Sequence, residues 1–368
     1  MQQGAATPGM VALLGSGEAT AAGRWVLGGL LRLLDEPRTI AVLDSPAGFQ
    51  PNHVRVAEKV ADFINEKVAE FHPKPRVIET RRAALGTPIG DAALHAILAA
   101  RCIVAGPGSP TYMIAELSDT PYMEAIRQAH RDGTAIYVSS AATIAMSAMS
   151  VPVYEIFKVG VEPYWQEGLD LLGPFGMHLA LVPHWNNSEG GAELDTRFCY
   201  MGQQRFEQLR AKLPDGMVML GIDEHSACIL DFATGQVTVD GKGGARVVRD
   251  NQIIEFASGE AFPMTLLGAD PDVLQQMRAN ISAEHIIAAP ITEHIPSPAS
   301  TLNPWIEEDN LAARIPPQLI DTLLAIRMDL RSAKQWAFSD RIRDALTAVD
   351  IVVEDTPDGP RWHLAEAE

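Results

Sequence analysis

Short apolar runs that end in glycine or serine and lead into helical patterns are the feature of this chain that most restricts its fold. Four of them lie in the first half of the sequence: "MVALLGSGE" (10–18), "RTIAVLDSPAG" (38–48), "ARCIVAGPGSPTYMIAEL" (100–117) and "TAIYVSSAATIAMS" (134–147). Continuous apolar strands that alternate with helices are typical of a parallel sheet covered on both faces. The sequence therefore predicts an α/β fold with a doubly wound, mostly parallel sheet. In such folds ligands bind beyond the carboxyl ends of the strands, where these turns would lie.

The pattern changes after about residue 218, where shorter strands are joined by turns. These strands are expected to finish the sheet in antiparallel fashion. Residues 269–315 are rich in proline and are expected to form a linker with some helix. The remainder predicts two amphipathic helices followed by a strand-like end. The expected organisation is an α/β domain at 1–268, the linker, and a small C-terminal helical hairpin at 316–368.

Composition excludes several classes of protein. A net charge of −18 disfavours broad contact with nucleic acid or with an anionic membrane. The three cysteines, Cys102, Cys199 and Cys228, lie far apart and form no CxxC pair, so neither a disulfide framework nor a zinc site is expected. No apolar run reaches the ~18 residues that a membrane-spanning helix needs. We therefore expect a cytoplasmic protein without a metal and without membrane contact.

Two glycine loops follow predicted strands. "LLGSGEAT" has Gly15 and Gly17 but lacks the third glycine of a dinucleotide-binding loop, so we favour a plain turn and expect no cofactor. In "AGPGSPTY", Gly106 and Gly108 permit a tight backbone, and Pro110 suits the first turn of a helix. The amide groups of such a loop can bind an anion, but an ordinary tight turn explains this segment equally well.

Three residues could form a catalytic triad. Ser140 ends an apolar run, but Val138 and Ala142 stand where the generic G-x-S-x-G nucleophile elbow has glycines, so that motif is not matched. A nucleophilic serine also needs a base and a carboxylate that orients the base. His184 follows the run in "LALVPHWNNSEGG", at the same predicted sheet edge, and Glu224 follows the run in "MLGIDEHSACILD". Each residue alone would be assigned a structural role, but the order Ser, His, Glu at one edge favours catalysis.

The segments "GPGSPTY", "SSAAT", "VPHWNNSEGGAELDTRF" and "LGIDEHSA" together resemble the cyanophycinase and aspartyl dipeptidase (peptidase E) family of serine peptidases. The resemblance covers roughly residues 10–257. It implies a catalytic domain similar to the class I glutamine amidotransferase fold.

The resemblance also implies roles for particular residues. Ser140 would be the nucleophile, His184 the base and Glu224 the residue that orients the base. The oxyanion hole would use the backbone amides of Ala141 and of the loop around Gly108. For substrate binding the resemblance implies Arg197, in "DTRF", which would recognise an acidic side chain, and Ser109, in "GPGSPTY".

The chain departs from the family pattern in two places. The family elbow has glycine where this chain has Ala142, and alanine resists positive φ, so the serine hydroxyl could sit out of line with the base. The segment 150–173, "SVPVYEIFKVGVEPYWQEGLDLLG", has no counterpart in the peptidases. Its side chains are expected either to contact a substrate or to pack in a surface loop; the candidates are Tyr154, Lys158, Tyr164 and Trp165.

Residues 316–363 resemble the C-terminal helical hairpin and tail of bacterial cysteinyl-tRNA synthetases. Nothing in the chain resembles the catalytic signatures of those enzymes. Residues 316–368 contain six basic and ten acidic side chains, and this balance disfavours phosphate binding and therefore a nucleic-acid partner. The hairpin is expected to serve in packing or in homodimer formation.

Three hypotheses follow. The preferred one is a serine peptidase that cleaves an amide bond in a small, acidic peptide or isopeptide. The second is a catalytically silent relative that binds a ligand or acts as a scaffold, a hypothesis that rests on the altered elbow. The third is a translation-linked hydrolase that touches tRNA with its tail.

Overall fold

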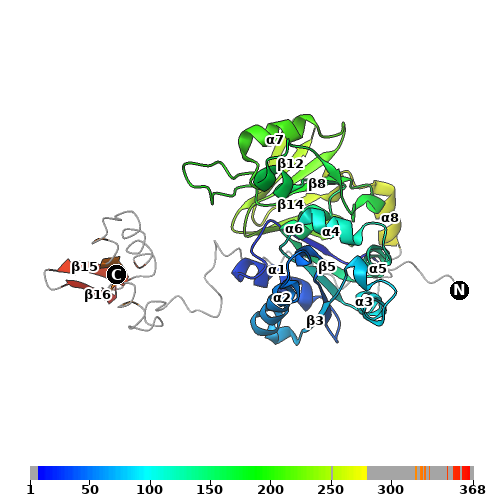
Figure 1. Ribbon diagram of the computed structural model, residues 1–368, viewed down its shortest axis with the longest axis horizontal. Coiled ribbons are helices and arrows are strands. Elements are labelled where there is room, and N and C mark those ends of the chain that lie inside the picture. Colours follow the sequence, from blue (N-terminus) through cyan, green and yellow to red (C-terminus); the bar gives the residue numbers. More distant parts are fainter. Residues whose placement is uncertain are drawn as a thin grey trace. The chain divides into compact units, whose positions relative to one another are not determined.

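The structure is a computed structural model that describes residues 7–249, 252–279 and, in the C-terminal part, 320, 324–325, 327–328, 331, 346, 351–356 and 359–364. The chain divides into two compact units, residues 1–297 and 298–368. The first unit contains the candidate site and is described first (Figure 1).

An eight-stranded sheet with the order β14-β11-β10-β1-β5-β4-β2-β3 forms the centre of the first unit. Five neighbouring strands are parallel: β1 (Val11–Leu14), β5 (Ala135–Ser139), β4 (Cys102–Ala105), β2 (Thr39–Leu43) and β3 (Lys74–Ile78). Three strands continue the sheet in antiparallel fashion: β10 (Ser226–Asp231), β11 (Gln236–Gly241) and β14 (Ala261–Pro263). The prediction of a mostly parallel α/β sheet is confirmed.

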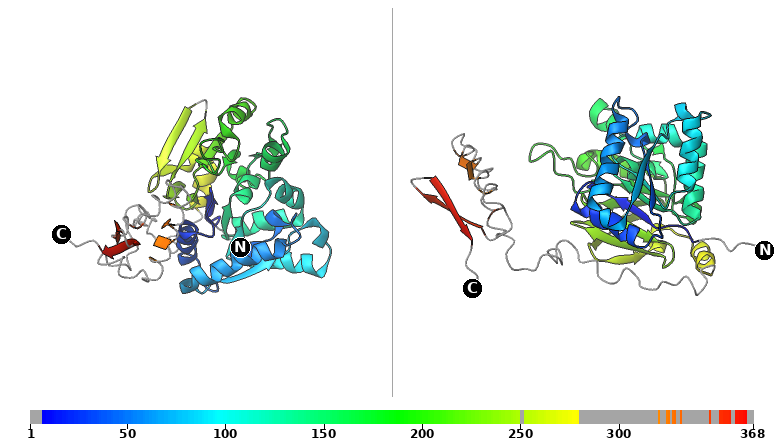
Figure 2. Two further views of the ribbon diagram at one scale, coloured as in Figure 1. Left: turned by 60° about the vertical axis from the view of Figure 1, so that its left-hand side comes forward. Right: turned by 90° about the horizontal axis from the view of Figure 1, so that it is seen from below.

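Helices cover both faces of this sheet (Figures 1 and 2). Alternate residues of a strand face opposite sides, so Ala12 and Leu14 pack in one core cluster and Val11 and Leu13 in another. The first cluster includes side chains of α1 (Ala21–Arg32) and α2 (His53–Lys67). The second cluster includes those of α3 (Pro88–Leu98), α4 (Pro110–Leu117) and α5 (Pro121–Arg131). This two-sided burial explains why the parallel strands are apolar throughout.

A second, four-stranded sheet has the order β13-β12-β9-β8. It consists of β8 (Leu179–Val182), β9 (Val218–Ile222), β12 (Gly244–Arg249) and β13 (Gln252–Ala257), of which β8 and β9 are parallel. The prediction that these runs belong to the central sheet is wrong. After β9 the chain passes between the two sheets at three turns, and one residue at each has positive φ: His225 (55°), Gly241 (125°) and Gly259 (89°).

The remaining elements of the first unit are short. They are the helices α6 (Ala141–Ala145), α7 (Gly202–Ala211) and α8 (Pro271–Ala279), the strand pair β6 (Met149–Ser150) and β7 (Gln166–Glu167), and several single helical turns that include Ser45–Ala47 and Glu155–Val159. α8 lies in the segment expected to be a linker with some helix. Its Leu274 is buried in the second core cluster, which also contains side chains of α3, α4 and α5. Residues 280–315 of that segment lie outside the described residues.

The described residues of the second unit form a small cluster of their own. Strands β15 (Ile351–Thr356) and β16 (Gly359–Leu364) pair antiparallel, in agreement with the strand-like end expected from the sequence. Ile351 is buried against helical residues, with Ile320, Leu324 and Leu346 in the same cluster. Within the described parts of the whole chain, no helix combines the length and the apolarity needed to cross a membrane.

Candidate active site

Ser140 occupies a strained turn between β5 and α6. Its backbone has φ 53° and ψ −115°, a conformation that L-residues rarely adopt, and its N–H donates to the Leu14 carbonyl oxygen over 3.2 Å. β5 is buried along its length, so the turn places the hydroxyl at the carboxyl end of a rigid strand. This is the geometry of a nucleophile elbow.

Ala142 does not relax this elbow. It lies within α6, its carbonyl oxygen accepts the N–H of Met146, and it is not among the residues with positive φ. The unusual backbone conformation falls on Ser140 itself. The expectation that the missing glycine would move the hydroxyl out of line is therefore wrong, because position 142 has ordinary helical geometry.

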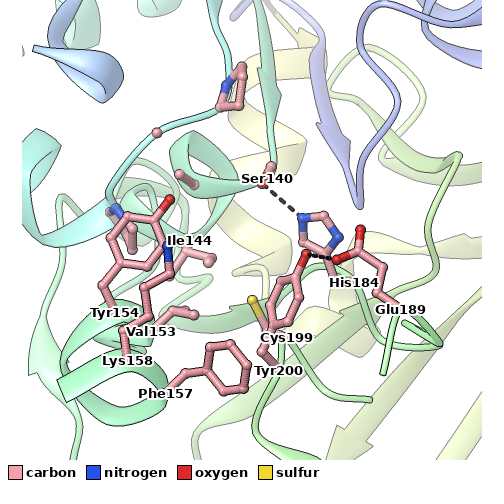
Figure 3. A pocket seen from close by; sticks show the side chains of 14 residues that line it. Ser140, Ile144, Val153, Tyr154, Phe157, Lys158, His184, Glu189, Cys199 and Tyr200 are labelled. Atoms are coloured by element: carbon pink, nitrogen blue, oxygen red, sulfur yellow. Dashed lines mark hydrogen bonds between the residues drawn. The ribbon is translucent and has the colours of Figure 1, made fainter. Parts of the chain in front are cut away.

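The side chains of Ser140, His184 and Glu224 form a continuous hydrogen-bonded chain. The Oγ atom of Ser140 lies 2.8 Å from Nε2 of His184, as drawn in Figure 3. The Nδ1 atom of the same ring lies 2.8 Å from Oε1 of Glu224. An ionised carboxylate can only accept, so Nδ1 carries the proton and Nε2 is left to accept the hydroxyl proton of the serine.

Two asparagines missed by the sequence analysis hold Glu224 in place. Asn187 donates from Nδ2 to Oε1 of Glu224 over 2.8 Å, and Asn186 accepts the backbone N–H of Glu224 through Oδ1 over 2.8 Å. The contact with His184, followed by that with Asn187, lowers the pKa of the Glu224 carboxyl below its usual range. The adjacent asparagines in "VPHWNNSEGG" were the available signal, since hydrogen-bond donors favour the charged form of a partly buried carboxylate.

The three residues come from two sheets. Ser140 follows β5 of the central sheet, whereas His184 and Glu224 follow β8 and β9, parallel neighbours in the second sheet. Val182 pairs with Gly221 in that ladder, so the two strands end at the same level. The side chains of His184 and Glu224, which follow these strand ends, therefore lie close together. The expectation of a single sheet edge is wrong, but the convergence it implied is present.

The structure brings both candidates for the oxyanion hole to the wall of the same cavity as Ser140. Ala141 is the first residue of α6, where backbone N–H groups have no partner within the helix. Gly108 has φ 156°, and a Cβ at this position would overlap the carbonyl group of Pro46. Only glycine fits this position, which explains the second glycine of "AGPGSPTY".

The two candidates for substrate binding lie elsewhere. Ser109 is buried and its Oγ accepts the N–H of Tyr112 over 3.2 Å, so it caps α4 and does not line the cavity. Arg197 is exposed and binds Asp195 through two hydrogen bonds of 2.9 and 2.8 Å. That pairing lowers the pKa of Asp195 far below its usual range. Neither residue lines the cavity that contains Ser140 and His184.

A cavity of about 390 Å³ opens beside the triad (Figure 3). Its wall combines the elbow, the glycine loop, the segment 153–158 and the turn at 199–200; the lining residues are Pro107, Gly108, Pro110, Ser140, Ala141, Ile144, Val153, Tyr154, Phe157, Lys158, His184, Glu189, Cys199 and Tyr200. Of the four candidates from segment 150–173, Tyr154 and Lys158 line the cavity. Trp165 instead donates from Nε1 to the Leu209 carbonyl oxygen over 2.8 Å.

Two further observations concern the cysteine of the cavity wall and the side chains that could bind a metal. Burial raises the pKa of the Cys199 thiol to about 12, so this cysteine is a neutral part of the wall and not a nucleophile at physiological pH. No group of three or more histidine, cysteine, aspartate or glutamate side chains suited to a metal ion occurs among the residues that the structure describes.

Comparison with known proteins identifies the fold. A solved peptidase from an acI-B1 Actinobacterium has a TM-score of 0.56 and 17% sequence identity, and the match covers 71% of this chain and 98% of that protein. A putative peptidase E protein from Listeria monocytogenes EGD-e gives a TM-score of 0.40 and 12% identity over 68% of this chain and 98% of that one. The first match shows that the chain shares its α/β fold with that solved protein. No family model matches the sequence.

Curated relatives match only a short stretch of the chain. Cysteine–tRNA ligase from Lactobacillus gasseri is 54% identical over 46 residues, which are 12% of this chain and 10% of the ligase. The ligase from Ectopseudomonas mendocina is 46% identical over 55 residues, 15% of this chain and 12% of the ligase. The matched stretch thus spans about a tenth of the length of these relatives.

Proposed function

We propose that this protein is a serine hydrolase that cleaves an amide bond in a small, acidic peptide or isopeptide. The observation that carries the proposal is the pair of 2.8 Å contacts from Ser140 through His184 to Glu224. They join a hydroxyl, an imidazole and a carboxylate in the order that nucleophilic catalysis needs. The fold shared with a solved peptidase supports the same reaction class.

The reaction begins with acylation of the serine. Ser140 Oγ attacks the substrate carbonyl carbon while its proton passes to Nε2 of His184. The negative charge that develops on the carbonyl oxygen is stabilised by the backbone N–H groups of Ala141 and of the loop at Gly108. Imidazolium then donates its proton to the leaving nitrogen, the C–N bond breaks, and an acyl-serine ester remains.

Deacylation repeats these steps with water as the nucleophile. His184 Nε2 takes a proton from water, hydroxide attacks the ester carbonyl, and Ser140 leaves as its oxygen is reprotonated. Glu224 keeps the imidazole oriented and stabilises its charged form in both halves. The lowered pKa of Glu224 supports this role, because the carboxylate stays ionised at neutral pH.

The site geometry also bears on the alternative of a silent ligand-binding relative. That hypothesis rested on a hydroxyl displaced from its base, and a 2.8 Å contact between Ser140 and His184 argues against displacement. The size of the cavity, about 390 Å³, supports a small substrate. The cytoplasmic location and a homodimer remain predictions.

A panel of dipeptides with acidic or neutral first residues tests this proposal. The wild type is expected to release free amine from at least one acidic substrate, and Ser140→Ala and His184→Ala are expected to lower kcat by at least about a thousandfold. Ser139→Ala is the matched control, because Ser139 is buried and donates to Glu18 over 2.5 Å, away from the base. Hydrolysis that survives in Ser140→Ala would contradict the mechanism.

A further inference from the structure

Two charged side chains outside the triad line the active-site cavity, and they lie on different sides of it. In Figure 3, Tyr154 and Lys158 occupy one side, His184, Glu189 and Tyr200 the other, with Ser140 between them. Glu189 already accepts a hydrogen bond of 2.9 Å from the Tyr200 hydroxyl. The cavity therefore has a cationic side and an acidic side.

The Lys158 ammonium has no acidic partner within the described residues. Its Nζ lies 4.4 Å from the centroid of the Tyr154 ring, and no described carboxylate lies within 4.0 Å of it. Cation–π contact holds the ammonium without neutralising its charge. In a protein of net charge −18, this makes Lys158 a local site of attraction for an anion.

The turn that carries Lys158 is held in place by neighbouring elements. Ile156, two residues earlier, is fully buried in a core cluster. Glu155 accepts a hydrogen bond of 3.1 Å from the Thr111 hydroxyl of α4, and the Tyr154 ring lies 6.3 Å from that of Phe49. The lysine thus projects from a fixed support, as a selective contact requires.

The position of the base decides which part of a substrate Lys158 would meet. His184 must protonate the leaving nitrogen, so the leaving group lies on the side of His184 and Tyr200. The acyl group, which stays on Ser140, then extends to the opposite side, towards Tyr154 and Lys158. Arg197, the cation expected to read an acidic side chain, is held by Asp195 and lines no part of the cavity.

We propose that Lys158, supported by Tyr154, is the residue that selects acyl groups bearing a carboxylate. This inference rests on the proposed serine hydrolase function and assigns its preference for acidic substrates to a residue of segment 150–173.

Two aldehydes that differ in charge but hardly in shape test this assignment. Aldehydes add reversibly to an activated serine, so acetyl-aspartyl aldehyde and acetyl-asparaginyl aldehyde can each be titrated against the rate of fluorophosphonate labelling of Ser140. The readout is the ratio of the two concentrations that halve labelling. Aspartate β-semialdehyde, whose free carboxylate is the α-carboxylate, distinguishes a side-chain acid from the free acid of an isopeptide.

In the wild type we expect an acidic aldehyde to protect at a concentration about tenfold lower than the asparaginyl aldehyde. Lys158→Met should bring the ratio to about one and Lys158→Glu should reverse it, because a charge reversal at a contact site reverses the preference. Lys59→Met, on the exposed surface of α2, should keep the wild-type ratio.

The outcomes separate this inference from the function on which it rests. The role of Lys158 would be overturned if the wild type were labelled but protected equally by all three aldehydes, or if the acidic preference survived Lys158→Met. Either result would leave the proposed serine hydrolase function standing. A wild type that is not labelled at Ser140 would overturn the hydrolase, and the role of Lys158 with it.

Discussion

Asn187 donates a hydrogen bond of 2.8 Å to Oε1 of Glu224, the same carboxylate oxygen that contacts Nδ1 of His184. Asn187 is almost fully buried, and its own Oδ1 accepts the N–H of Glu189 over 3.2 Å. A neutral side chain therefore fixes the orientation of the carboxylate and of the loop beside it. This makes Asn187 a positioning residue, distinct from the groups that touch a substrate.

Asn187→Asp keeps the acceptor for Glu189 but replaces the donor to Glu224 with a second carboxylate. The facing charge should raise the pKa of Glu224, which is lowered in the wild type. We expect Ser140 labelling to slow at least about tenfold at pH 7 and its acid limb to move to higher pH, because protonated Glu224 no longer stabilises the imidazolium. Asn186→Asp, which preserves the exposed acceptor for the Glu224 N–H, is the control; an unchanged pH profile in Asn187→Asp would contradict this role.

The two glycines of "AGPGSPTY" should respond differently to alanine. At Gly106 a Cβ would lie 3.7 Å from Cγ2 of Val60, an ordinary contact, whereas at Gly108 it would overlap the Pro46 carbonyl and φ is 156°. Gly108→Ala is expected to lower the free energy of unfolding by more than about 2 kcal/mol and to slow Ser140 labelling. Gly106→Ala should differ little from the wild type in both. Urea unfolding and the rate of Ser140 labelling should be measured for both variants. Equal effects of Gly106→Ala and Gly108→Ala would refute the claim that only position 108 requires glycine.

Ala142→Gly tests whether the elbow needs the glycine that the resemblance led us to expect. Because Ala142 has helical geometry, the substitution should leave the rate of Ser140 labelling within about twofold of wild type. It should cost about 0.5–1 kcal/mol of stability, since glycine loses more backbone entropy in a helix. A rise in labelling of about a hundredfold would mean instead that the wild-type elbow is misaligned.

His130 should make the stability of the first unit depend on pH. Burial lowers the pKa of this histidine to about 4, and its Nε2 contacts the Gly9 carbonyl oxygen over 2.8 Å. In the unfolded chain the histidine has an ordinary pKa of about 6.5, so the unfolded chain binds the proton more readily than the native state. The contribution of His130 to the free energy of unfolding is therefore fully present above about pH 6.5 and is lost as the pH falls towards 4.

The expected loss from this histidine between pH 7.5 and pH 5.0 is about 2 kcal/mol. His130→Gln can still donate to Gly9 but does not titrate, so its free energy of unfolding should fall less steeply over the same interval. Exposed His95→Gln is the control and should keep the wild-type pH dependence. Urea unfolding curves at the two pH values decide, and identical slopes for wild type and His130→Gln would count against the prediction.

The sequence was informative where local pattern determines structure. Apolar runs that end in small residues predicted the parallel sheet, and the run before Ser140 predicted the strand, turn and helix that carry it. The order of Ser140, His184 and Glu224, with the resemblance to peptidases, predicted which side chains would meet. These inferences depend on neighbours along the chain or on turns at strand ends.

Long-range choices could not be read in the same way. The runs that form β8 and β9 are as apolar as that of β1, so nothing in them indicates which sheet they join. The later crossings between the sheets fall at turns with positive φ at His225, Gly241 and Gly259. Asp195 neutralises Arg197 from two residues away, and the choice between that partner and a substrate depends on side-chain geometry. For the same reason, the sequence could not decide whether Lys158 contacts a substrate or packs in a surface loop.

The most direct test of the account is the intact mass of the protein after exposure to a fluorophosphonate, with the labelled peptide mapped. We predict one adduct per chain, on Ser140, in the wild type and in Ser139→Ala, and none in Ser140→Ala, with labelling at least about a hundredfold slower in His184→Ala. An unlabelled wild type, or equal labelling of wild type and Ser140→Ala, would contradict the claim that Ser140 is an activated nucleophile.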